Sequence, residues 1–195
     1  MNILTYILSS LYFFLPAYFV NMAPPLARRA AVFNFLYKPV DFGKKFFGQP
    51  LLGSHKTWLG VIFGILAGIL ITLFQLWLYQ FSFIQKISLI NYQKISPVSN
   101  FGVGVNILVF GFLISAGAVF GDLLSAFIKR RLKIAPGAKF IPFDQTNYVI
   151  GAAIFLTPYL KIDIRVWITI FILTFFLHII SNRLGYLLKV HQAKW

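Results

Sequence analysis

Carboxylates and basic side chains, which are scarce or scattered elsewhere, come together in residues 121–151. Four residues of the chain are acidic, all of them Asp, and Asp122 and Asp144 both lie in this stretch. Between them is the densest basic cluster of the protein, which consists of Lys129, Arg130, Arg131, Lys133 and Lys139. Carboxylates suit Mg²⁺, which usually takes one or two of them together with substrate phosphates, and Lys and Arg bind phosphate oxygens. The stretch therefore predicts a metal-assisted site for a nucleoside triphosphate or another polyphosphate.

The other residue types point away from most other kinds of catalysis. The chain has no Cys, which excludes disulfides and thiolate chemistry. The three His residues are scattered, no Cys–His or Ser–His–Asp grouping is evident, and we interpret His55, beside Lys56, as incidental. Nucleotidyl transfer needs mainly positioning and charge neutralisation from the protein. A metal ion with a basic rim would therefore suffice.

The composition predicts what positions these residues. Of 195 residues, 59% are hydrophobic, and the mean hydropathy is +0.80, which is too apolar for a soluble domain of this size. We predict an all-α integral membrane protein that forms a single membrane domain over 1–195. The net charge of +14 is typical of cytoplasmic loops that face anionic lipid, and we expect no nucleic-acid partner.

The apolar runs predict five transmembrane helices. The expected spans are 3–22, 57–80, 102–121, 148–160 and 166–188. Two long polar connections, 23–56 and 122–147, are predicted to be functional loops, because long ordered loops usually carry function. Within the second span, Gly60, Gly64 and Gly68 recur every four residues and predict a face for close helix packing.

The distribution of charge predicts the orientation. Fourteen of the eighteen Lys and Arg residues fall in the two long loops and at the C-terminal end. By the positive-inside rule these segments are cytoplasmic and the N-terminus is outside, as five spans require. The loops then bring three of the four carboxylates, Asp41, Asp122 and Asp144, to the cytoplasmic face of a multi-pass protein in the cell membrane.

Two segments of the sequence resemble one family. PVDFGKKFFGQPLLGSHKTWLGVIFGILAG (39–68) and GDLLSAFIKRRLKIAPGAKFIPFDQTNYVIGA (121–152) are similar to CDP-archaeol synthases, which are related to CDP-diacylglycerol synthases. The resemblance covers most of the chain. It implies a CTP-dependent lipid-phosphate cytidylyltransferase of phospholipid biosynthesis that uses Mg²⁺. Its partners would be CTP and an unsaturated archaeal diether-glycerol phosphate, and its products a CDP-lipid and pyrophosphate.

The resemblance also implies residue roles. Asp122 and Asp144 would be metal ligands and, with Lys129, catalytic. The substrate contacts would be Asp41, Gly43, Lys44, Lys56, Thr57, Ser125, Arg130, Arg131, Gln145 and Asn147. The chain departs from the family pattern at one of these positions, because Asn147 stands where the family has a second Asp, three residues after Asp144. An Asn carbonyl can bind a metal ion but brings no charge.

The residues leave two alternatives open. The same reaction on phosphatidic acid would need the same groups, since hydrophobic grooves discriminate weakly between ether and ester chains. A non-catalytic lipid-binding or transport protein would have no need of Asp144, but few polar residues lie within the predicted spans. The sequence makes no prediction about oligomeric state, the number of metal ions or the preferred lipid chain.

Overall fold

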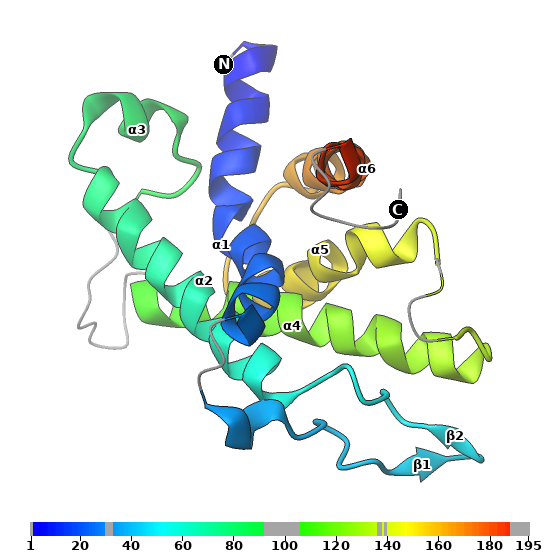
Figure 1. Cartoon of the computed structure of the whole chain (residues 1–195). Helices are drawn as coiled ribbons and strands as arrows, with labels where there is room; N and C mark the ends of the chain where they lie inside the picture. The colour runs from blue at the N-terminus through cyan, green and yellow to red at the C-terminus, as the bar shows by residue number, and fades with distance from the viewer. Residues whose placement is uncertain (1, 30–32, 92–105, 136–137, 139, 188–195) are drawn as a thin grey trace.

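The protein is an assembly of helices with one small hairpin (Figure 1). The computed structural model describes residues 2–29, 33–91, 106–135, 138 and 140–187. Its helices are α1 (Ile3–Arg29), the 3₁₀ helix η1 (Asn34–Tyr37), α2 (Trp58–Leu78), α3 (Ser82–Ile87), α4 (Ile107–Arg131), α5 (Phe143–Leu156) and α6 (Ile164–Leu187). Strands β1 (Lys45–Phe46) and β2 (Gln49–Pro50) pair in antiparallel fashion. The predicted helical architecture is thus confirmed for most of the described residues, with the hairpin as an addition.

Small residues set the packing of α1, α2 and α4. Gly64 of α2 lies against Val20 of α1, and Gly68 lies against Ser115 of α4. A Cβ atom at Gly68 would be 1.9 Å from the Ser115 Oγ, so only glycine lets the two helices approach this closely. The packing face predicted for the second span is therefore present, and it joins α2 to helices on both sides.

Helix α5 runs back along α4 in the opposite direction. Gly117 of α4 faces Gly151 of α5, and Gly121 faces the backbone of Asn147. At the other end, the Asn106 N–H at the start of α4 donates to the Tyr159 hydroxyl, just beyond α5, at 3.0 Å. The segment from α5 to Tyr159 thus runs antiparallel to α4 and reaches the N-terminal end of α4.

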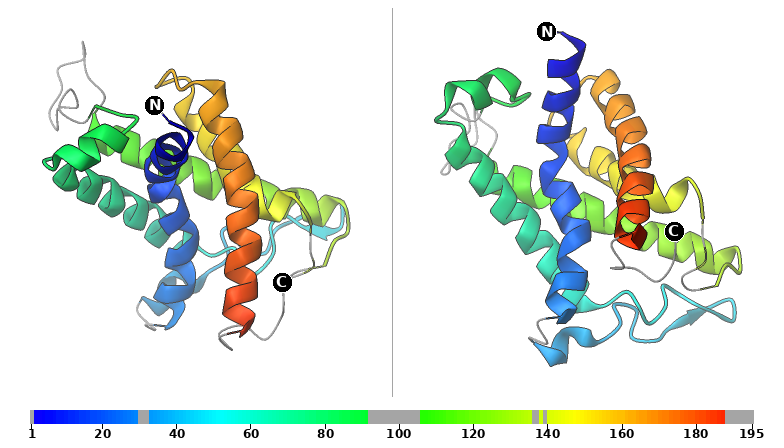
Figure 2. Two further views of the ribbon diagram at one scale, coloured as in Figure 1. Left: turned by 90° about the horizontal axis from the view of Figure 1, so that it is seen from above. Right: turned by 45° about the horizontal axis from the view of Figure 1, so that its top comes forward.

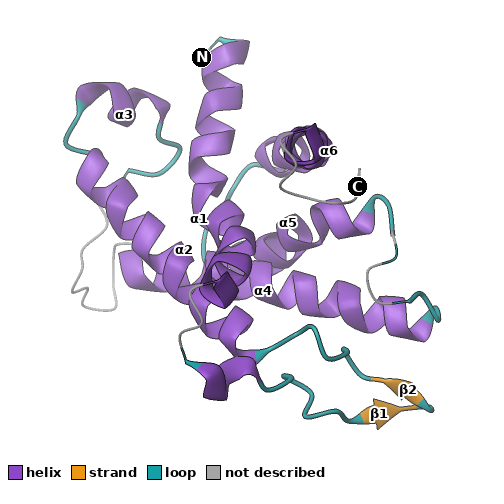
Figure 3. Cartoon of the chain, viewed as in Figure 1, coloured by secondary structure: helices purple, strands orange, loops and turns teal. Residues whose placement is uncertain are grey.

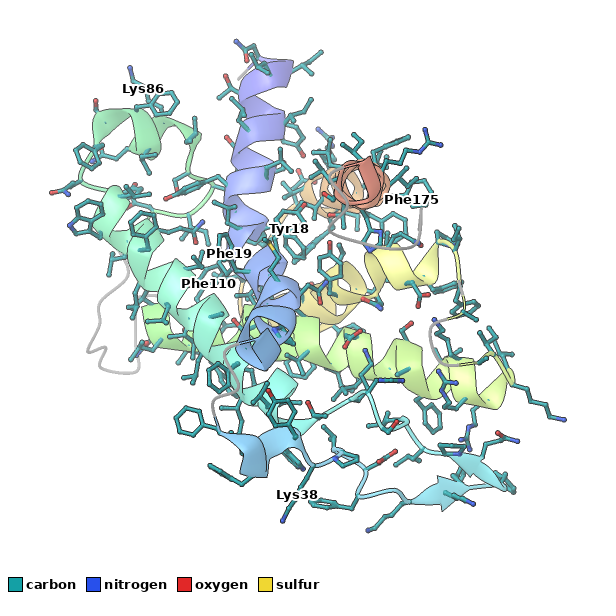
Figure 4. The ribbon with its side chains drawn as sticks, viewed as in Figure 1. Tyr18, Phe19, Lys38, Lys86, Phe110 and Phe175 are labelled. Atoms are coloured by element: carbon teal, nitrogen blue, oxygen red, sulfur yellow. The ribbon has the colours of Figure 1, made fainter. Side chains whose placement is uncertain are left out.

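Aromatic side chains fill the space where the long helices cross. Phe13 and Phe14 of α1 are almost fully buried, as is Phe110 of α4, and Figure 4 shows Phe110 close to this crossing. Trp167 of α6 packs edge-on against both Phe13 and Phe14. Because lipid is as apolar as these rings, tight packing rather than removal from water stabilises this core.

In the part of the chain that the structure describes, four helices are long and apolar enough to cross a membrane. They are Ile3–Pro24 within α1, Trp58–Leu78, Ile107–Arg131 and Ile164–Ser181. Helix α5 has 14 residues and is about 21 Å long at 1.5 Å per residue, less than the roughly 30 Å of a bilayer core. The chain is thus a multi-pass membrane protein, and its fourth predicted span, 148–160, corresponds to α5, which begins earlier, at Phe143, and ends earlier, at Leu156.

The boundaries of the two predicted loops differ from the structure. Helix α1 continues into 23–56 as far as Arg29, and α4 continues into 122–147 as far as Arg131. Hydropathy falls at Asp122, but Leu, Ala, Lys and Arg still favour a helix, and basic residues in its last turn interact well with the helix dipole. The predicted positions 102–105, Lys139 and 188 lie outside the described residues.

Polar loops gather at one end of the assembly. Figure 2 shows the hairpin and the loop before α2 alongside the C-terminal half of α4, away from the start of α1. In Figure 4, Lys38 lies at this end and Lys86, on α3, at the opposite one. The hairpin end is where the predicted site residues collect.

Candidate active site

The first feature of the site is an ion pair between the loop before α2 and the helix α4. The Lys56 Nζ lies 2.7 and 2.6 Å from the two carboxylate oxygens of Asp122. Lys56 is fixed because the chain on either side of it pairs with 38–40: the Val40 N–H donates to the Lys56 carbonyl at 2.8 Å, and the Trp58 N–H to the Lys38 carbonyl at 3.1 Å. Thr57 then begins α2, where its hydroxyl caps the Gly60 N–H at 3.4 Å. The loop and α4 are thereby joined at one point.

A second ion pair joins α4 to α5. The Lys129 Nζ lies 2.7 Å from the Asp144 Oδ2 and also donates to the Ala138 carbonyl at 2.6 Å. Asp144 further accepts from the Phe140 N–H at 3.0 Å and from the Ser125 hydroxyl at 3.4 Å. Asp122, Ser125 and Lys129 follow the helical spacing i, i+3, i+7, so α4 presents all three on one face.

Both ion pairs line one cavity of about 400 Å³. Besides the two pairs, Ser125 and Arg130 contribute polar groups to its wall. The volume lies within the range of small-ligand sites, roughly 300–1,000 Å³. Five predicted site residues of α4 and α5, together with Lys56 of the preceding loop, are thus brought together around a space that can hold a ligand.

Asp41 does not line this cavity but shapes the loop that borders it. Its carboxylate accepts from the N–H groups of Gly43 at 3.0 Å, Leu52 at 2.8 Å and Gly53 at 3.1 Å. Burial raises the pKa of the Asp41 carboxyl, but these backbone hydrogen bonds outweigh it, and the net pKa lies below the usual 3.8. The predicted substrate contact is therefore engaged with the backbone, which ties residues 41–43 to residues 52–53.

The neighbouring side chains of Arg130 and Arg131 make different contacts, and Arg131 binds the hairpin. Arg131 donates to the carbonyls of Phe46, Gln49 and Pro50, and its guanidinium stacks over the rings of Phe46 and Phe127 at 5.3 and 5.1 Å. It fastens the hairpin to the end of α4, and Figure 3 shows the hairpin and its teal loops beside that end.

Arg130 is more available to a ligand. It is 8% exposed, its NH1 group donates to the Ile134 carbonyl at 2.6 Å, and its buried Nε has no hydrogen-bond partner among the described residues. It also borders a second cavity of about 420 Å³, together with Asp41, Gly43 and Lys45. The Arg131 Nε likewise has no partner among the described residues, but Arg131 lines neither of these cavities, so Arg130 is the arginine of the pair that is placed to bind an anion.

The remaining predicted contacts lie outside the main cavity. Lys44 is exposed beside the hairpin. Gln145 and Asn147 are 9% and 8% exposed on α5, and neither is among the described residues that line the cavity. The buried Gln145 Oε1 has no hydrogen-bond partner among the described residues.

Sequence reasoning missed four cavity residues, Leu52, Gly53, His55 and Ala126. His55, interpreted as incidental, lines the main cavity, and so does Leu52. The position of His55 directly before Lys56 was a usable signal, because neighbouring residues of a loop pinned at Lys56 stay near Asp122. Nothing in the residue type of Leu52 could have indicated its place.

The donor atoms suit one hard cation. Among the described residues, no group of three His, Cys, Asp or Glu side chains could hold a metal ion. Two carboxylates and a hydroxyl, from Asp122, Asp144 and Ser125, nevertheless line one cavity. Mg²⁺ commonly takes one or two carboxylates and completes its shell with water and phosphate oxygens, so these residues fit Mg²⁺ bound together with a polyphosphate.

Three comparisons with known proteins point to enzymes of archaeal lipid biosynthesis. The family model described as "CarS-like: CDP-archaeol synthase" matches residues 3–195. CDP-archaeol synthase of Methanocaldococcus jannaschii is 34% identical over 188 residues, 96% of each chain, and that of Methanococcus maripaludis strain C5 is 31% identical over 196 residues, covering each chain completely. A solved structure of an intramembrane enzyme for archaeal membrane lipid biosynthesis has a TM-score of 0.68 and 25% identity, over 90% of this chain and 94% of the other.

Proposed function

The chain belongs to the CDP-archaeol synthase family, and we propose that it transfers the cytidylyl group of CTP to an unsaturated archaeal diether-glycerol phosphate. That it is a CTP-dependent cytidylyltransferase follows from the family. The observation that carries the assignment to particular residues is the cavity of about 400 Å³ lined by two lysine–carboxylate pairs. A polyphosphate needs cationic contacts, and its metal ion needs carboxylates; both are present there.

The proposed reaction forms one bond and breaks another at the α-phosphorus of CTP. A non-bridging oxygen of the lipid phosphate attacks this phosphorus, a new P–O–P linkage forms, and the bond to the β-phosphate breaks. Pyrophosphate leaves with the bonding electrons, and the products are a CDP-lipid and pyrophosphate. The protein contributes positioning and charge stabilisation rather than a covalent intermediate.

We assign the residues to this reaction as follows. Lys129 and Arg130 hold the triphosphate, because the ammonium of Lys129 and the guanidinium of Arg130 both line the cavity of about 400 Å³. Asp122 and Asp144 would hold Mg²⁺, which when bound neutralises phosphate charge. Lys56 and Lys129 balance these carboxylates in the structure as described, so binding of the metal–nucleotide would release both lysines toward phosphate oxygens.

We also propose five membrane crossings, with the site on the cytoplasmic side. Contacts between α4 and α5 support a return crossing, since Tyr159 reaches the level of Asn106. Among the described residues, the basic side chains of the hairpin end outnumber those near α3 and before α6, which include Lys86, Lys161 and Arg165. This asymmetry supports a cytoplasmic hairpin end and an outside N-terminus.

One experiment tests the proposed function and its main alternatives. Purified protein is incubated with radiolabelled CTP, Mg²⁺ and one lipid phosphate at a time. We expect more CDP-lipid from digeranylgeranylglyceryl phosphate than from phosphatidic acid. Faster turnover of phosphatidic acid would contradict the ether-lipid assignment, and no labelled lipid in any reaction would favour a lipid-binding or transport protein.

A further inference from the structure

A second, smaller cavity of about 100 Å³ lies where α1, α2 and α4 meet. Asn21 of α1, His55, Lys56 and Asp122 contribute polar groups to its wall, and Val61 of α2 and Leu123 of α4 contribute apolar ones. Polar groups from a loop and apolar groups from three membrane helices thus surround one small space.

The three helices close together just beyond this cavity. At Gly64, one turn further along α2, an added Cβ would lie 3.2 Å from the Val20 side chain, and at Gly68 it would overlap Ser115. At Gly60, which lines the cavity, the nearest atoms are 3.6 Å or more away, on Pro24 and Thr57. The space is therefore confined to the first turn of α2, at the hairpin end of the membrane helices.

The small cavity adjoins the larger one. His55, Lys56 and Asp122 line both, so the Lys56–Asp122 pair lies at their junction. A group in the small cavity and a group in the larger cavity would therefore both lie beside this pair. An acceptor and a nucleotide bound in the two cavities would thus be held next to each other, as a transfer between them requires.

We infer that the small cavity binds the phosphate monoester of the lipid acceptor, an inference that rests on the proposed function. At about 100 Å³, the cavity is well below the roughly 300 Å³ of a typical ligand pocket and suits a phosphate rather than a nucleoside triphosphate. Lys56, the Asn21 amide and His55 supply cationic or hydrogen-bonding groups for its oxygens. The apolar walls lead the attached glycerol ether toward the membrane.

Substituted-cysteine protection tests the subsite without requiring turnover. The chain has no native Cys, so Val61→Cys reports on the small cavity alone and Leu52→Cys on the larger one alone. The reaction rate of each variant with a methanethiosulfonate reagent is measured in detergent, with CTP, with digeranylgeranylglyceryl phosphate, and with digeranylgeranylglycerol, which lacks the phosphate.

We expect the lipid phosphate to slow the labelling of Val61→Cys about tenfold or more, which corresponds to a site that is at least about 90% occupied. CTP should slow the labelling of Leu52→Cys and leave that of Val61→Cys unchanged. The phosphate-free lipid should protect Val61→Cys much less. Equal protection by the two lipids, or protection of Leu52→Cys alone by the lipid phosphate, would overturn the subsite. Because labelling needs no product, a chain that forms no CDP-lipid but shows this protection would contradict the proposed function and leave the subsite standing.

A cavity-filling pair gives a second readout. Gly60→Leu should fill the space and raise the KM for the lipid phosphate at least about tenfold while the Kd for CTP stays within about twofold. Gly60→Ala is the matched control, because its Cβ meets only ordinary contacts. A parallel rise of both constants in Gly60→Leu would place the acceptor elsewhere; if that variant does not fold, the protection experiment still decides.

Discussion

Lys56 and Asp122 are 66 residues apart, and the ammonium group of Lys56 lies within 2.7 Å of both carboxylate oxygens of Asp122. This pair joins the two segments on which the family resemblance rests, the loop before α2 and the end of α4. It also lies at the junction of the two cavities. Its position makes it the point at which the nucleotide, the metal ion and the lipid phosphate would meet.

Replacing either cavity carboxylate should abolish activity without unfolding the protein. We expect Asp122→Asn and Asp144→Asn each to lower kcat by roughly 100-fold or more, because the neutral amide no longer offsets the charge of a bound cation. Activity is measured as CDP-lipid formation and folding as thermal stability in detergent. Asp163→Asn is the control, since exposed Asp163 lies before α6, away from the cavity, and its carboxylate accepts from the Arg165 N–H. Near-normal turnover in both cavity variants would contradict the assigned site.

The neighbouring arginines should give opposite phenotypes. Arg130→Lys should weaken CTP binding, measured by equilibrium dialysis, with little change in stability. Arg131→Lys should lose the fork that holds three hairpin carbonyls and lower stability by about 1 kcal/mol, or ~2–4 °C in Tm. If Arg131→Lys instead weakened CTP binding at unchanged Tm, the guanidinium would be a nucleotide contact rather than a clamp for the hairpin.

The role of Asp41 should depend on pH in a defined direction. Because the folded-state pKa of Asp41 lies below the usual 3.8, its contribution is present above that value and is lost as pH falls through the folded pKa. Asp41→Asn should therefore make the loop 38–57 more sensitive to proteolysis at pH 7, and the difference from the wild type should shrink below about pH 4. A difference that persists at low pH would mean that the carboxylate charge is not what orders the loop.

The sequence alone predicted the helical membrane class and the pairing of distant segments. Hydropathy located the long helices, and the spacing of Gly64 and Gly68 indicated the face that packs on α1 and α4. Charge placed Lys56 and Asp122 on one face, where they do pair.

Other features depend on three-dimensional contacts that no single residue type reveals. Hydropathy ended the third span near Asp122, whereas helix propensity carries α4 to Arg131. The difference between Arg130 and Arg131 arises from where the hairpin carbonyls lie. The resemblance implied that Asp41 contacts substrate, but no sequence signal indicated that its carboxylate also accepts from three N–H groups of the folded loop.

The proposed five crossings can be tested with single cysteines in a chain that has none. Exposed Ser54 lies at the hairpin end, exposed Ser82 begins α3, and exposed Lys161 lies between α5 and α6. In intact cells an impermeant maleimide should label Ser82→Cys and Lys161→Cys, and should label Ser54→Cys only after permeabilisation. Labelling of Lys161→Cys only after permeabilisation would mean that α5 does not return across the membrane.

Asn147 is the position at which the chain departs from the family pattern, and its replacement should show what the amide does. It follows Asp144 by one turn of α5 and is 8% exposed, and a carboxylate there would be costly unless a cation balanced it. We expect Asn147→Asp to preserve or raise turnover and to lower the Mg²⁺ concentration that gives half-maximal activity, since a cation bound at Asp144, one turn earlier, would offset the added charge. Asn147→Ala is the control: it should raise that Mg²⁺ concentration if the amide carbonyl binds the cation, and lower only Tm if the side chain merely packs. A large loss of activity in Asn147→Asp at unchanged Tm would mean that the amide N–H₂ donates a hydrogen bond that a carboxylate cannot replace.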